Sequence, residues 1–351
     1  MIKVPKIGVV VLTFNSERFI DRCLTSIEKQ TYKNFVIYAV DNASTDNSAK
    51  RLLKHSCIIL RQEINTGFAE GNNIGMRRAL KDGCDAVMLL NIDAYLDNQT
   101  LERLVERMNR KGEKIGAVQS LILLHPNTDR INSSGNIIHY LGFGYTRDYK
   151  RPISALSSLT KNDLSIPYAS GAAVLYTKRA LEVVGLFDES FFLYHEDLDL
   201  SWRMRLEGFD IVLVPQARAY HEYSFSRSIK KYYYMERNRL MFLVKNFSLK
   251  YLILIFPLFF ITEIGLDFYS FKNGFIIERM QAWHYFFKKK NRKRLISSRK
   301  IVQQKRKLSD KEMVNYLTDV IAFQDVESVL LEKVGNPIFK LYFRLIVKPF
   351  I

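Results

Sequence analysis

The sequence contains few cysteines, and their positions indicate no disulfide framework. Cys23, Cys57 and Cys84 are the three cysteines of the 351 residues, and they form neither a CxxC pair nor an even set. This pattern argues against a disulfide-stabilised extracellular scaffold and favours a reducing, cytosolic setting. The first six residues also lack the layout of a signal peptide, because they lead directly into a strand-like segment.

The C-terminal part lacks an uncharged run long enough to cross a membrane. Residues 251–261 are 11 successive positions without a charge, but Glu263 and Asp267 follow soon after. A spanning helix needs about 20 apolar residues. We therefore expect this segment to lie in, or dip into, one leaflet of a bilayer as an interfacial helix. A second hydrophobic core is the alternative interpretation.

Acidic residues are scarce in one region of the chain. Between Tyr223 and Ser309 there are 20 Lys and Arg but only four Asp and Glu, so this quarter holds +16 of the net charge of +17. It includes the cationic run Lys288–Arg294, which follows Trp283 and three further aromatic residues. Such a region attracts nucleic acid or anionic lipid, and the aromatic neighbours favour lipid. We expect an anionic membrane surface and no nucleic acid as partner, with a solvated basic helix as the alternative.

The first ~120 residues alternate between strand and helix signals, which predicts an α/β fold with a mostly parallel, Rossmann-like sheet. The β-rich runs predict strands at residues 7–13, 35–40, 57–60, 86–90 and 115–124. The periodic segments between them predict helices at residues 16–30, up to Lys54, from an entrance within 65–75 to about Lys81, and 98–110.

Periodicity fades between His125 and Ile166, where we expect loops and small strands laid over one edge of the sheet. Order returns with predicted strands at 172–177 and 211–214 and predicted helices at 179–184 and up to Glu207. The composition changes after Tyr223. We therefore divide the chain into a globular domain, residues 1–222, and a basic, apolar, helical region, residues 223–351.

Polar side chains follow three of the predicted strands at the points where these strands end. They are Thr13 and Asn15, Asp41 and Asn42, and Asn91 and Asp93. Carboxyl ends of parallel strands meet at the edge where ligands bind, and carboxylate and amide oxygens suit a divalent cation bridging nucleotide phosphates. The glycines between Gly67 and Gly75 would let backbone approach a ligand at a helix N-terminus. Each site taken alone is equally typical of an ordinary Asn/Asp turn.

Five motifs in this order resemble family 2 glycosyltransferases, and most closely the rhamnosyltransferases and galactofuranosyltransferases of bacterial and archaeal surface glycans. The resemblance covers about Ile7 to Tyr223, and its motifs are Val11–Asn15, Val40–Asp46, Asn65–Asn73, Leu90–Asp93 and His195–Leu200. It implies a GT-A fold, a nucleoside-diphosphate sugar donor, a divalent metal (Mg or Mn) and inversion at the anomeric carbon.

The resemblance also implies roles for the donor-side residues. Asp41 would hold the nucleobase, with Thr13 and Asn15 near the nucleoside. The remaining donor positions are Asn42, Gly67, Asn72 and Asn91. Asp93 occupies the last position of the family's Asp-X-Asp motif and would ligate the metal, whereas Asn91 stands where that motif has its first Asp. His221 matches a position that is a second metal ligand in part of the family; a structural role is the alternative.

Glycosyl transfer with inversion needs one carboxylate that takes the proton of the acceptor hydroxyl. By family position this base is Asp197, with Glu196 as a substitute. The alternative is that both residues only stabilise a helix N-terminus. Asp199 lies four residues before Arg203, which predicts an ordinary ion pair. Leu198, Trp202 and Leu206 share a helical stripe that is typical of a core.

The acceptor or donor-sugar pocket is expected around Ser170, Gly171, Trp202 and Arg239. Ser170 and Gly171 lie where the family lines this pocket, although a Gly turn before a strand gives the same pattern. Tyr232–Tyr234 with Arg237 and Arg239 could hold the phosphate of a lipid-linked acceptor, since Arg suits phosphate recognition. A helix with an aromatic core face is the alternative there.

These observations predict an inverting, metal-dependent glycosyltransferase, peripheral or monotopic on the cytoplasmic face of the cell membrane. It would extend a polyprenyl-linked or cell-wall glycan, with deoxythymidine-diphosphate rhamnose as the first-choice donor and uridine-diphosphate galactofuranose, N-acetylglucosamine or glucose as alternatives. A nucleotidyltransferase is disfavoured because Phe14–Glu17, and not a Gly-rich basic loop, follows the first strand. A non-enzymatic membrane- or nucleic-acid-binding module is the other alternative. The oligomeric state is not predicted.

Overall fold

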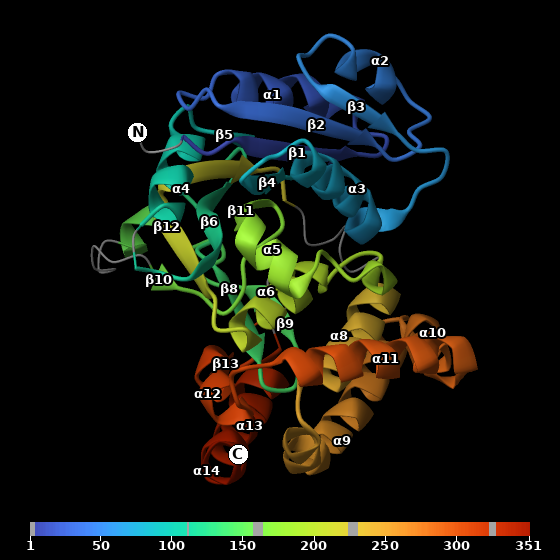
Figure 1. Ribbon diagram of the computed structural model, residues 1–351. Coiled ribbons are helices and arrows are strands. Elements are labelled where there is room, and N and C mark those ends of the chain that lie inside the picture. Colours follow the sequence, from blue (N-terminus) through green and yellow to red (C-terminus); the bar gives the residue numbers. More distant parts are fainter. Residues whose placement is uncertain (1–3, 111, 157–163, 224–230, 323–327) are drawn as a thin grey trace. The chain divides into compact units, whose positions relative to one another are not determined.

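Strand β4 (Ala86–Leu90) lies in the middle of the larger sheet and is buried along its whole length. The computed structural model in Figure 1 describes residues 4–110, 112–156, 164–223, 231–322 and 328–351. The chain divides into two compact units. Unit 1 comprises residues 1–136, 146–204 and 209–223, and unit 2 comprises residues 137–145, 205–208 and 224–351. The predicted first domain, residues 1–222, therefore includes two short stretches, 137–145 and 205–208, that belong to unit 2 with the C-terminal region.

The sheet of unit 1 has the strand order β10-β12-β6-β11-β4-β1-β2-β3, with β5 paired to β12 and β7 paired to β6. Its strands besides β4 are β1 (Ile7–Thr13), β2 (Phe35–Asp41), β3 (Ile58–Arg61), β5 (Ala94–Leu96), β6 (Ile115–Leu124), β7 (Ile131–Ser133), β10 (Leu164–Ser165), β11 (Ala173–Thr177) and β12 (Asp210–His221). The predicted strands 7–13 and 115–124 are confirmed with the same bounds.

The sheet is mixed. Strands β1 to β4 are parallel to one another where they pair, as the alternating pattern predicts, and β6 is parallel to β12. Strand β11 runs antiparallel to both of its neighbours, β4 and β6. A parallel pairing needs a crossover connection. The segment between β6 and β11 has no α-helix among its described residues, so the chain can return in the opposite direction.

Helices cover both faces of this sheet (Figure 1). Alternate residues of β4 enter two different cores: Ala86, Met88 and Leu90 face α1 (Glu17–Glu28) and α4 (Thr100–Met108), and Val87 and Leu89 face α3 (Gly67–Lys81), α5 (Lys178–Val184) and α6 (Glu196–Leu206). The short helix α2 (Ser48–Leu52) lies after β2. This arrangement follows from the period of two in a strand that is buried on both faces.

Of the segment between His125 and Ile166, the described residues contain short strands and a 3-10 turn, η1 (Ile153–Leu156), and residues 157–163 lie outside them. Strand β10 pairs with β12 at the edge of the sheet, and β7 pairs with β6. The expectation of small strands at one edge is therefore confirmed for β10.

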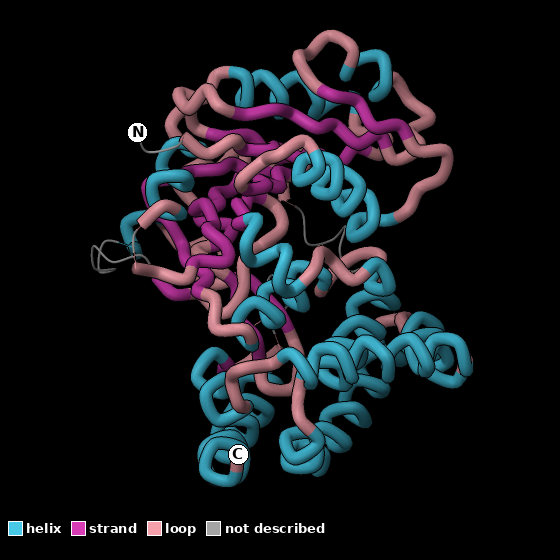
Figure 2. The backbone as a smooth tube through the Cα atoms, in the orientation of Figure 1, coloured by secondary structure: helices cyan, strands magenta, loops and turns pink. Residues whose placement is uncertain are grey.

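Unit 2 consists mainly of helices (Figure 2). They are α8 (Tyr232–Asn246), α9 (Leu249–Lys272), α10 (Ile276–Phe287), α11 (Lys289–Lys305) and α12 (Asp310–Met313), followed by the short pieces η3 (Val314–Tyr316), η4 (Leu331–Gly335), α13 (Asn336–Tyr342), η5 (Phe343–Val347) and α14 (Lys348–Phe350). Strands β8 (Asn136–His139), β9 (Gly144–Thr146) and β13 (Leu317–Thr318) form a small second sheet.

Helix α9 is longer than the uncharged run suggests. It continues through Glu263 and Asp267 to a length of 24 residues, and Ser248 caps its first turn. By length and composition it is the one helix of the described residues that could cross a membrane, a property shared with core helices of some soluble proteins. The expectation that this segment falls short of the length needed to cross a membrane is therefore wrong as far as helix length and composition are concerned.

Candidate active site

The first two strand ends of unit 1 bring their polar residues together. Thr13 on β1 lies level with Asp41 on β2, and the Asn42 amide donates to the Thr13 carbonyl at 2.9 Å. The Thr13 hydroxyl is buried and has no hydrogen-bond partner, so it is one orphaned polar group at this edge. Asp41 is also buried, and one carboxylate oxygen accepts a hydrogen bond from the Ser44 amide at 3.1 Å.

Asn15 is held in a left-handed backbone conformation, with φ of 49°. Its side-chain oxygen accepts hydrogen bonds from the amide and the hydroxyl of Thr45, at 2.8 and 3.2 Å. Asn is among the few non-Gly residues that tolerate this conformation. Asn15 therefore joins the loop after β1 to the loop after β2, on the exposed side of the two strand ends.

Asn42 has a structural role that fully explains its side chain. Its amide nitrogen donates to Asn65 Oδ1 and to the Gly67 carbonyl, and its oxygen accepts from the amide and hydroxyl of Thr66. These bonds fix the turn that leads into α3. Asn72 is also buried, and it donates to the Phe68 carbonyl. We therefore interpret Asn42 and Asn72 as residues that shape the donor side rather than donor ligands.

The entrance of α3 does not provide a free anion site. The amide of Gly67 donates to Asn65 Oδ1, and those of Phe68 and Ala69 donate to the Phe192 carbonyl at 2.7 and 3.1 Å. A Cβ at Gly67 would lie 2.4 Å from the Phe192 ring, and one at Gly71 would lie 2.5 Å from Leu12. The glycines thus serve close packing, and the expectation that they admit a phosphate is corrected.

Asn91 and Asp93 follow β4 in a tight turn. The Ala94 amide donates to the Asn91 carbonyl at 2.9 Å, and the Asn91 amide donates to the Ala172 carbonyl at 2.9 Å. Both Asn91 and Asp93 are partly exposed. The antiparallel β11 begins one residue after Ala172, so the start of β11 and the end of β4 share one edge of the sheet.

Asp93 is paired with His221, the last residue of β12. Asp93 Oδ1 lies 3.1 Å from His221 Nε2, and His221 Nδ1 lies 3.1 Å from Asn132 Oδ1. The Glu222 amide also donates to the Asp93 carbonyl at 3.0 Å, which fixes the two strand ends together. The structure thus brings together the two residues that were expected to bind a metal.

The hydrogen-bond partners of the two ring nitrogens of His221 indicate which nitrogen can bind a cation. If Nδ1–H donates to Asn132 Oδ1, Nε2 carries a lone pair that faces a carboxylate oxygen. Two acceptors at 3.1 Å need a proton or a cation between them. A metal-ligating His typically donates its other ring N–H to an oxygen, as His221 can to Asn132. The donor set of carboxylate and imidazole therefore fits a divalent cation, although no group of three or more metal-ligating side chains occurs among the described residues.

Asp197 lies at the N-terminus of α6. Its Oδ2 accepts from the Gly171 amide at 3.0 Å and its Oδ1 accepts from the Leu198 amide at 2.8 Å. Gly171 precedes Ala172, whose carbonyl is bonded to Asn91. Asp197, Gly171 and the Asn91–Asp93 turn are therefore linked by hydrogen bonds along one edge of the sheet. Ser170 extends this group through its amide, which donates to Gln119 Oε1.

Glu196 and Asp197 form a tightly spaced acidic pair. Burial raises the pKa of Asp197, although the hydrogen bonds from Gly171 and Leu198 oppose this shift. Burial, and then the neighbouring charge of Asp197, raise the pKa of Glu196 well above its usual range. Glu196 is almost fully buried, and its Oε2 has no hydrogen-bond partner. We expect Glu196 to hold the proton of the pair, so that Asp197 is the carboxylate available as a base.

The rest of α6 behaves as its pattern predicts. Asp199 pairs with Arg203 at 2.8 Å, and Arg203 also donates to backbone carbonyls of Val184 and Leu186, so the predicted ion pair is confirmed. Leu198, Trp202 and Leu206 are buried. Because the Trp202 side chain is completely buried in the core, the expectation that it lines an accessible pocket is corrected.

Arg239 belongs to unit 2 and is not available to a phosphate. Its guanidinium is buried and donates to Glu236 at 2.9 Å and to Glu263 at 2.7 Å. Arg237 is likewise buried, beside the rings of Tyr233, Tyr234 and Tyr285. A carboxylate-paired arginine in a core is a structural residue. The expected acceptor contact of Arg239 is therefore corrected.

The sequence did not single out Asn132, Gln119 or Phe192. Asn132 lies in the stretch without periodicity, so no pattern marks it. Phe192, Tyr194 and His195 have positive φ angles of 63°, 68° and 66° immediately before the acidic pair. Such conformations cost of order 1–3 kcal/mol each and persist only where the surroundings enforce them. A run of bulky residues gives no sign of this in the sequence.

The fold is that of known sugar-nucleotide enzymes. A structure of GalNAc-T7 with UDP, GalNAc and Mn²⁺ matches with a TM-score of 0.55 and 15% identity over 71% of this chain and 49% of that one. Residues 1–349 of Staphylococcus aureus TarS with UDP match with a TM-score of 0.52 and 16% identity over 90% of this chain and 84% of that one. The chain thus has the expected GT-A fold. The family model of glycosyl transferase family 2 matches residues 8–184, about half of the chain, and the chain belongs to that family.

Two relatives with known names share about a quarter of the aligned residues with this chain. A poly-β-1,6-N-acetyl-D-glucosamine synthase of Staphylococcus epidermidis is 26% identical over 219 residues, 61% of this chain and 49% of that protein. The N-acetylglucosaminyl-diphospho-decaprenol L-rhamnosyltransferase of Mycobacterium tuberculosis is 24% identical over 235 residues, 62% of this chain and 76% of that protein. The chain thus spans about half the length of the synthase that it matches.

Proposed function

We propose that this protein is an inverting, metal-dependent glycosyltransferase that moves a sugar from a nucleoside diphosphate to a lipid-linked or cell-surface glycan. The observation that carries this proposal is the hydrogen-bonded edge at which Asp197 meets Gly171, next to the turn that holds Asp93 against His221. A base and a cation-binding pair at one edge are what transfer from a diphosphate donor requires.

In this mechanism Asp197 accepts the proton of the acceptor hydroxyl as that oxygen attacks the anomeric carbon. The two backbone amides on Asp197 fix its orientation. The neighbouring protonated Glu196 avoids a second negative charge beside the base. Because burial raises the pKa of Asp197, it is a stronger base than an exposed aspartate, and proton transfer is more favourable.

Asp93 and His221 would hold a divalent cation, Mg²⁺ or Mn²⁺, which when bound neutralises the charge that grows on the leaving diphosphate. Two protein ligands are enough, because a Mg²⁺ site commonly uses one or two carboxylates together with substrate phosphates. Asn132 orients the imidazole through Nδ1. Asn91 supplies a neutral amide where a second carboxylate is common, so the cation depends on Asp93 and His221.

The donor nucleoside is expected at Thr13, Asn15 and Asp41. The Thr13 hydroxyl supports this location, because it lies at the strand edge and has no hydrogen-bond partner within the protein. We propose deoxythymidine-diphosphate rhamnose as donor, in line with the similarity to the mycobacterial L-rhamnosyltransferase. N-acetylglucosamine from a uridine-diphosphate donor is the alternative, and the similarity to the staphylococcal synthase favours it.

The mycobacterial relative is named for a decaprenol-linked acceptor. The basic C-terminal region of this chain suits binding to an anionic membrane surface. We therefore propose a polyprenyl-linked acceptor and a location on the cytoplasmic face of the cell membrane. The acceptor pocket would include Ser170 and Gly171, because the Gly171 amide donates to the proposed base Asp197.

The test is a screen of nucleotide-sugars for thermal stabilisation, with Mn²⁺ present or absent. We expect deoxythymidine-diphosphate rhamnose to raise the melting temperature more with the metal than without it. Asp93→Asn should lose this metal-dependent part, whereas the matched surface variant Asp129→Asn should keep it. If uridine-diphosphate sugars alone stabilise the protein, the donor is a uridine-diphosphate sugar and not deoxythymidine-diphosphate rhamnose. Absence of stabilisation by every nucleotide-sugar would contradict the proposed function.

A further inference from the structure

Helix α9 exposes a continuous apolar stripe and buries two polar residues in its C-terminal half. The residues that α9 buries include Glu263 and Ser270, whereas the exposed ones form an apolar stripe three or four residues apart: Leu249, Ile253, Phe256, Phe260, Ile264, Phe268 and Phe271. Phe268 is 71% exposed. Soluble helices show the opposite pattern. A helix with this polarity has a solvent other than water on its outer face.

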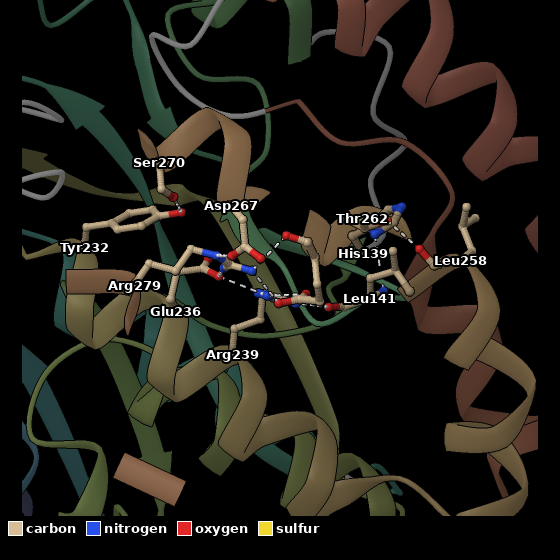
Figure 3. Close-up of polar contacts among 11 residues, drawn as sticks. His139, Leu141, Tyr232, Glu236, Arg239, Leu258, Thr262, Asp267, Ser270 and Arg279 are labelled. Atoms are coloured by element: carbon tan, nitrogen blue, oxygen red, sulfur yellow. Dashed lines mark hydrogen bonds and ion pairs between the residues drawn. The ribbon is translucent and has the colours of Figure 1, made fainter. Parts of the chain in front are cut away.

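The charges of α9 are neutralised within unit 2 (Figure 3). Glu263 accepts from Arg239 on α8 at 2.7 Å and from Arg279 on α10 at 2.8 Å. Asp267 accepts from Arg279 as well, and Glu236 on α8 binds both arginines. Glu263 is therefore buried in the interior of unit 2, whereas the Asp267 side chain is 53% exposed and is neutralised by Arg279. The residues of the exposed apolar stripe itself carry no charge.

This ion network also determines how α9 can meet a bilayer. It attaches α8 and α10 to the middle and C-terminal half of α9 through Glu263 and Asp267. A spanning α9 would carry these helices and their buried charges into the hydrocarbon, which costs several kcal/mol per ion. An α9 that lies along the surface exposes only its apolar stripe. The geometry therefore favours an in-plane orientation over a spanning one.

A second apolar stripe follows at the C-terminus. Residues 329–350 are continuously helical, and their exposed stripe is Leu330, Val334, Ile338, Leu341 and Leu345. The opposite side, with Phe339, Phe343 and Val347, is buried, and Phe343 stacks on Tyr140. The Tyr342 hydroxyl donates to the Leu254 carbonyl of α9 at 2.8 Å, so this helix packs directly beside α9.

The charge around these stripes fits an anionic surface. The exposed side chains of Lys288–Lys290 and Arg292–Arg294 open α11 in the same unit. The C-terminal helix adds four further basic residues, Lys333, Lys340, Arg344 and Lys348, against one acid, Glu332. Basic residues near an anionic bilayer strengthen binding to its surface by electrostatic attraction. A second protein copy would have to cover a surface that is both strongly cationic and aromatic.

We propose that the apolar stripes of α9 and of helix 329–350 together embed unit 2 in one leaflet of an anionic bilayer, with α9 lying in the membrane plane. This proposal extends the proposed function, because it names the surface that would bring the enzyme to a lipid-linked acceptor. It concerns lipid binding alone and needs neither donor nor metal. Its failure is therefore distinguishable from failure of the transferase assignment.

The first test is flotation of the full-length protein with vesicles of phosphatidylcholine and phosphatidylglycerol at a 7:3 ratio. Wild-type protein should float. The variants Ile253→Gln/Phe260→Gln/Phe268→Gln and Leu330→Gln/Ile338→Gln/Leu345→Gln should each bind at least tenfold more weakly. The matched control Leu53→Gln/Ile64→Gln changes two equally exposed apolar residues of unit 1 and should bind like wild type.

Because all altered side chains are exposed, the variants should keep the thermal transition and the nucleotide-sugar stabilisation of the wild type. Unchanged flotation of both stripe variants would overturn the proposal. So would a wild-type dimer that the stripe substitutions convert to a monomer without a change in vesicle binding, because a second copy would then cover this surface.

The in-plane orientation is tested with Phe260→Trp and lipids brominated at shallow or deep acyl positions. A surface-parallel α9 predicts stronger quenching of the new tryptophan by the shallow bromines. Stronger quenching by bromines near the bilayer centre would show that α9 crosses the membrane and would overturn this part of the proposal. The background from Trp202 and Trp283 is measured in the wild-type protein and subtracted.

Discussion

Asn132 gives a sharp test of the metal assignment, because it would act on the cation only through His221. Its side-chain oxygen lies 3.1 Å from His221 Nδ1, and it touches neither Asp93 nor the base in any described contact. The substitution Asn132→Ala removes the group that keeps the Nε2 lone pair of His221 directed at Asp93. The cation would then meet an imidazole free to rotate or to change its tautomer.

The expected size follows from the general behaviour of such outer partners. Loss of one of them weakens metal binding or activity about 10- to 100-fold. Each factor of ten corresponds to about 1.4 kcal/mol. We therefore expect Asn132→Ala to weaken Mn²⁺ binding by about 1.4–2.8 kcal/mol, while donor binding in the absence of metal stays the same.

The assay is a calorimetric titration of Mn²⁺ into protein saturated with a nucleoside diphosphate. Asn127→Ala is the matched control, since Asn127 is an exposed asparagine in the turn before strand β7, which contains Asn132. The control should bind Mn²⁺ like the wild type. Equal Mn²⁺ affinity of Asn132→Ala and wild type, with both variants folded, would refute the reasoning that His221 is an oriented ligand.

Three further predictions concern the acidic pair and the packing. The raised pKa of Glu196 means that the folded state binds a proton more tightly than the unfolded state, so the free energy of unfolding should fall as pH rises from the usual glutamate range through that raised pKa. Urea titrations of Glu196→Gln should not show this fall. An unchanged pH dependence in this variant would contradict the assignment. Gly71→Ala should destabilise the protein by about 1–3 kcal/mol, because its methyl group would lie 2.5 Å from Leu12. The control Gly83→Ala should cost less, because Gly83 has a positive φ but open space around it. Equal losses in urea unfolding would contradict this packing role of Gly71. Arg279→Met should cost about 3–5 kcal/mol of unfolding free energy, because it removes one of the two buried arginines that neutralise Glu236 and Glu263 and leaves Arg239 to pair with both. A loss below 1 kcal/mol would show that the ion network is dispensable.

The sequence predicts the N-terminal half of the sheet well because each element there has a clear period. Strands 7–13 and 115–124 match the structure in their bounds, and the third predicted helix ends at Lys81 as expected. The antiparallel direction of β11 is not predictable in this way. A single strand has the same period in both directions, and direction depends on how the preceding residues return across the sheet.

The candidate site follows the same division. Strand ends predict that Asp41, Asn91 and Asp93 lie at one edge, because topology alone fixes that. The contacts of Gly67 with Phe192, and of Asn42 with the turn before α3, depend on tertiary packing and reverse the expected ligand role of this entrance. Arg239 and Trp202 were misassigned for a similar reason. A buried and an exposed side chain can share one local pattern.

The C-terminal region shows where composition misleads. Charges at Glu263 and Asp267 shorten the apparent apolar run, yet Arg239 and Arg279 of two other helices neutralise the buried Glu263, and Arg279 also pairs with the partly exposed Asp267. The exposed stripe of helix 329–350 interleaves with basic residues, which conceals it in a linear reading. Partner side chains distant in the sequence decide both features.

The most direct measurement of the central claim is sugar transfer by Asp197→Asn, compared with donor stabilisation of the same variant. The proposed mechanism predicts that Asp197→Asn keeps the metal-dependent stabilisation by the donor and transfers no sugar, while the exposed carboxylate variant Glu182→Gln transfers sugar at the wild-type rate. Normal turnover by Asp197→Asn would contradict the assignment of this aspartate as the base.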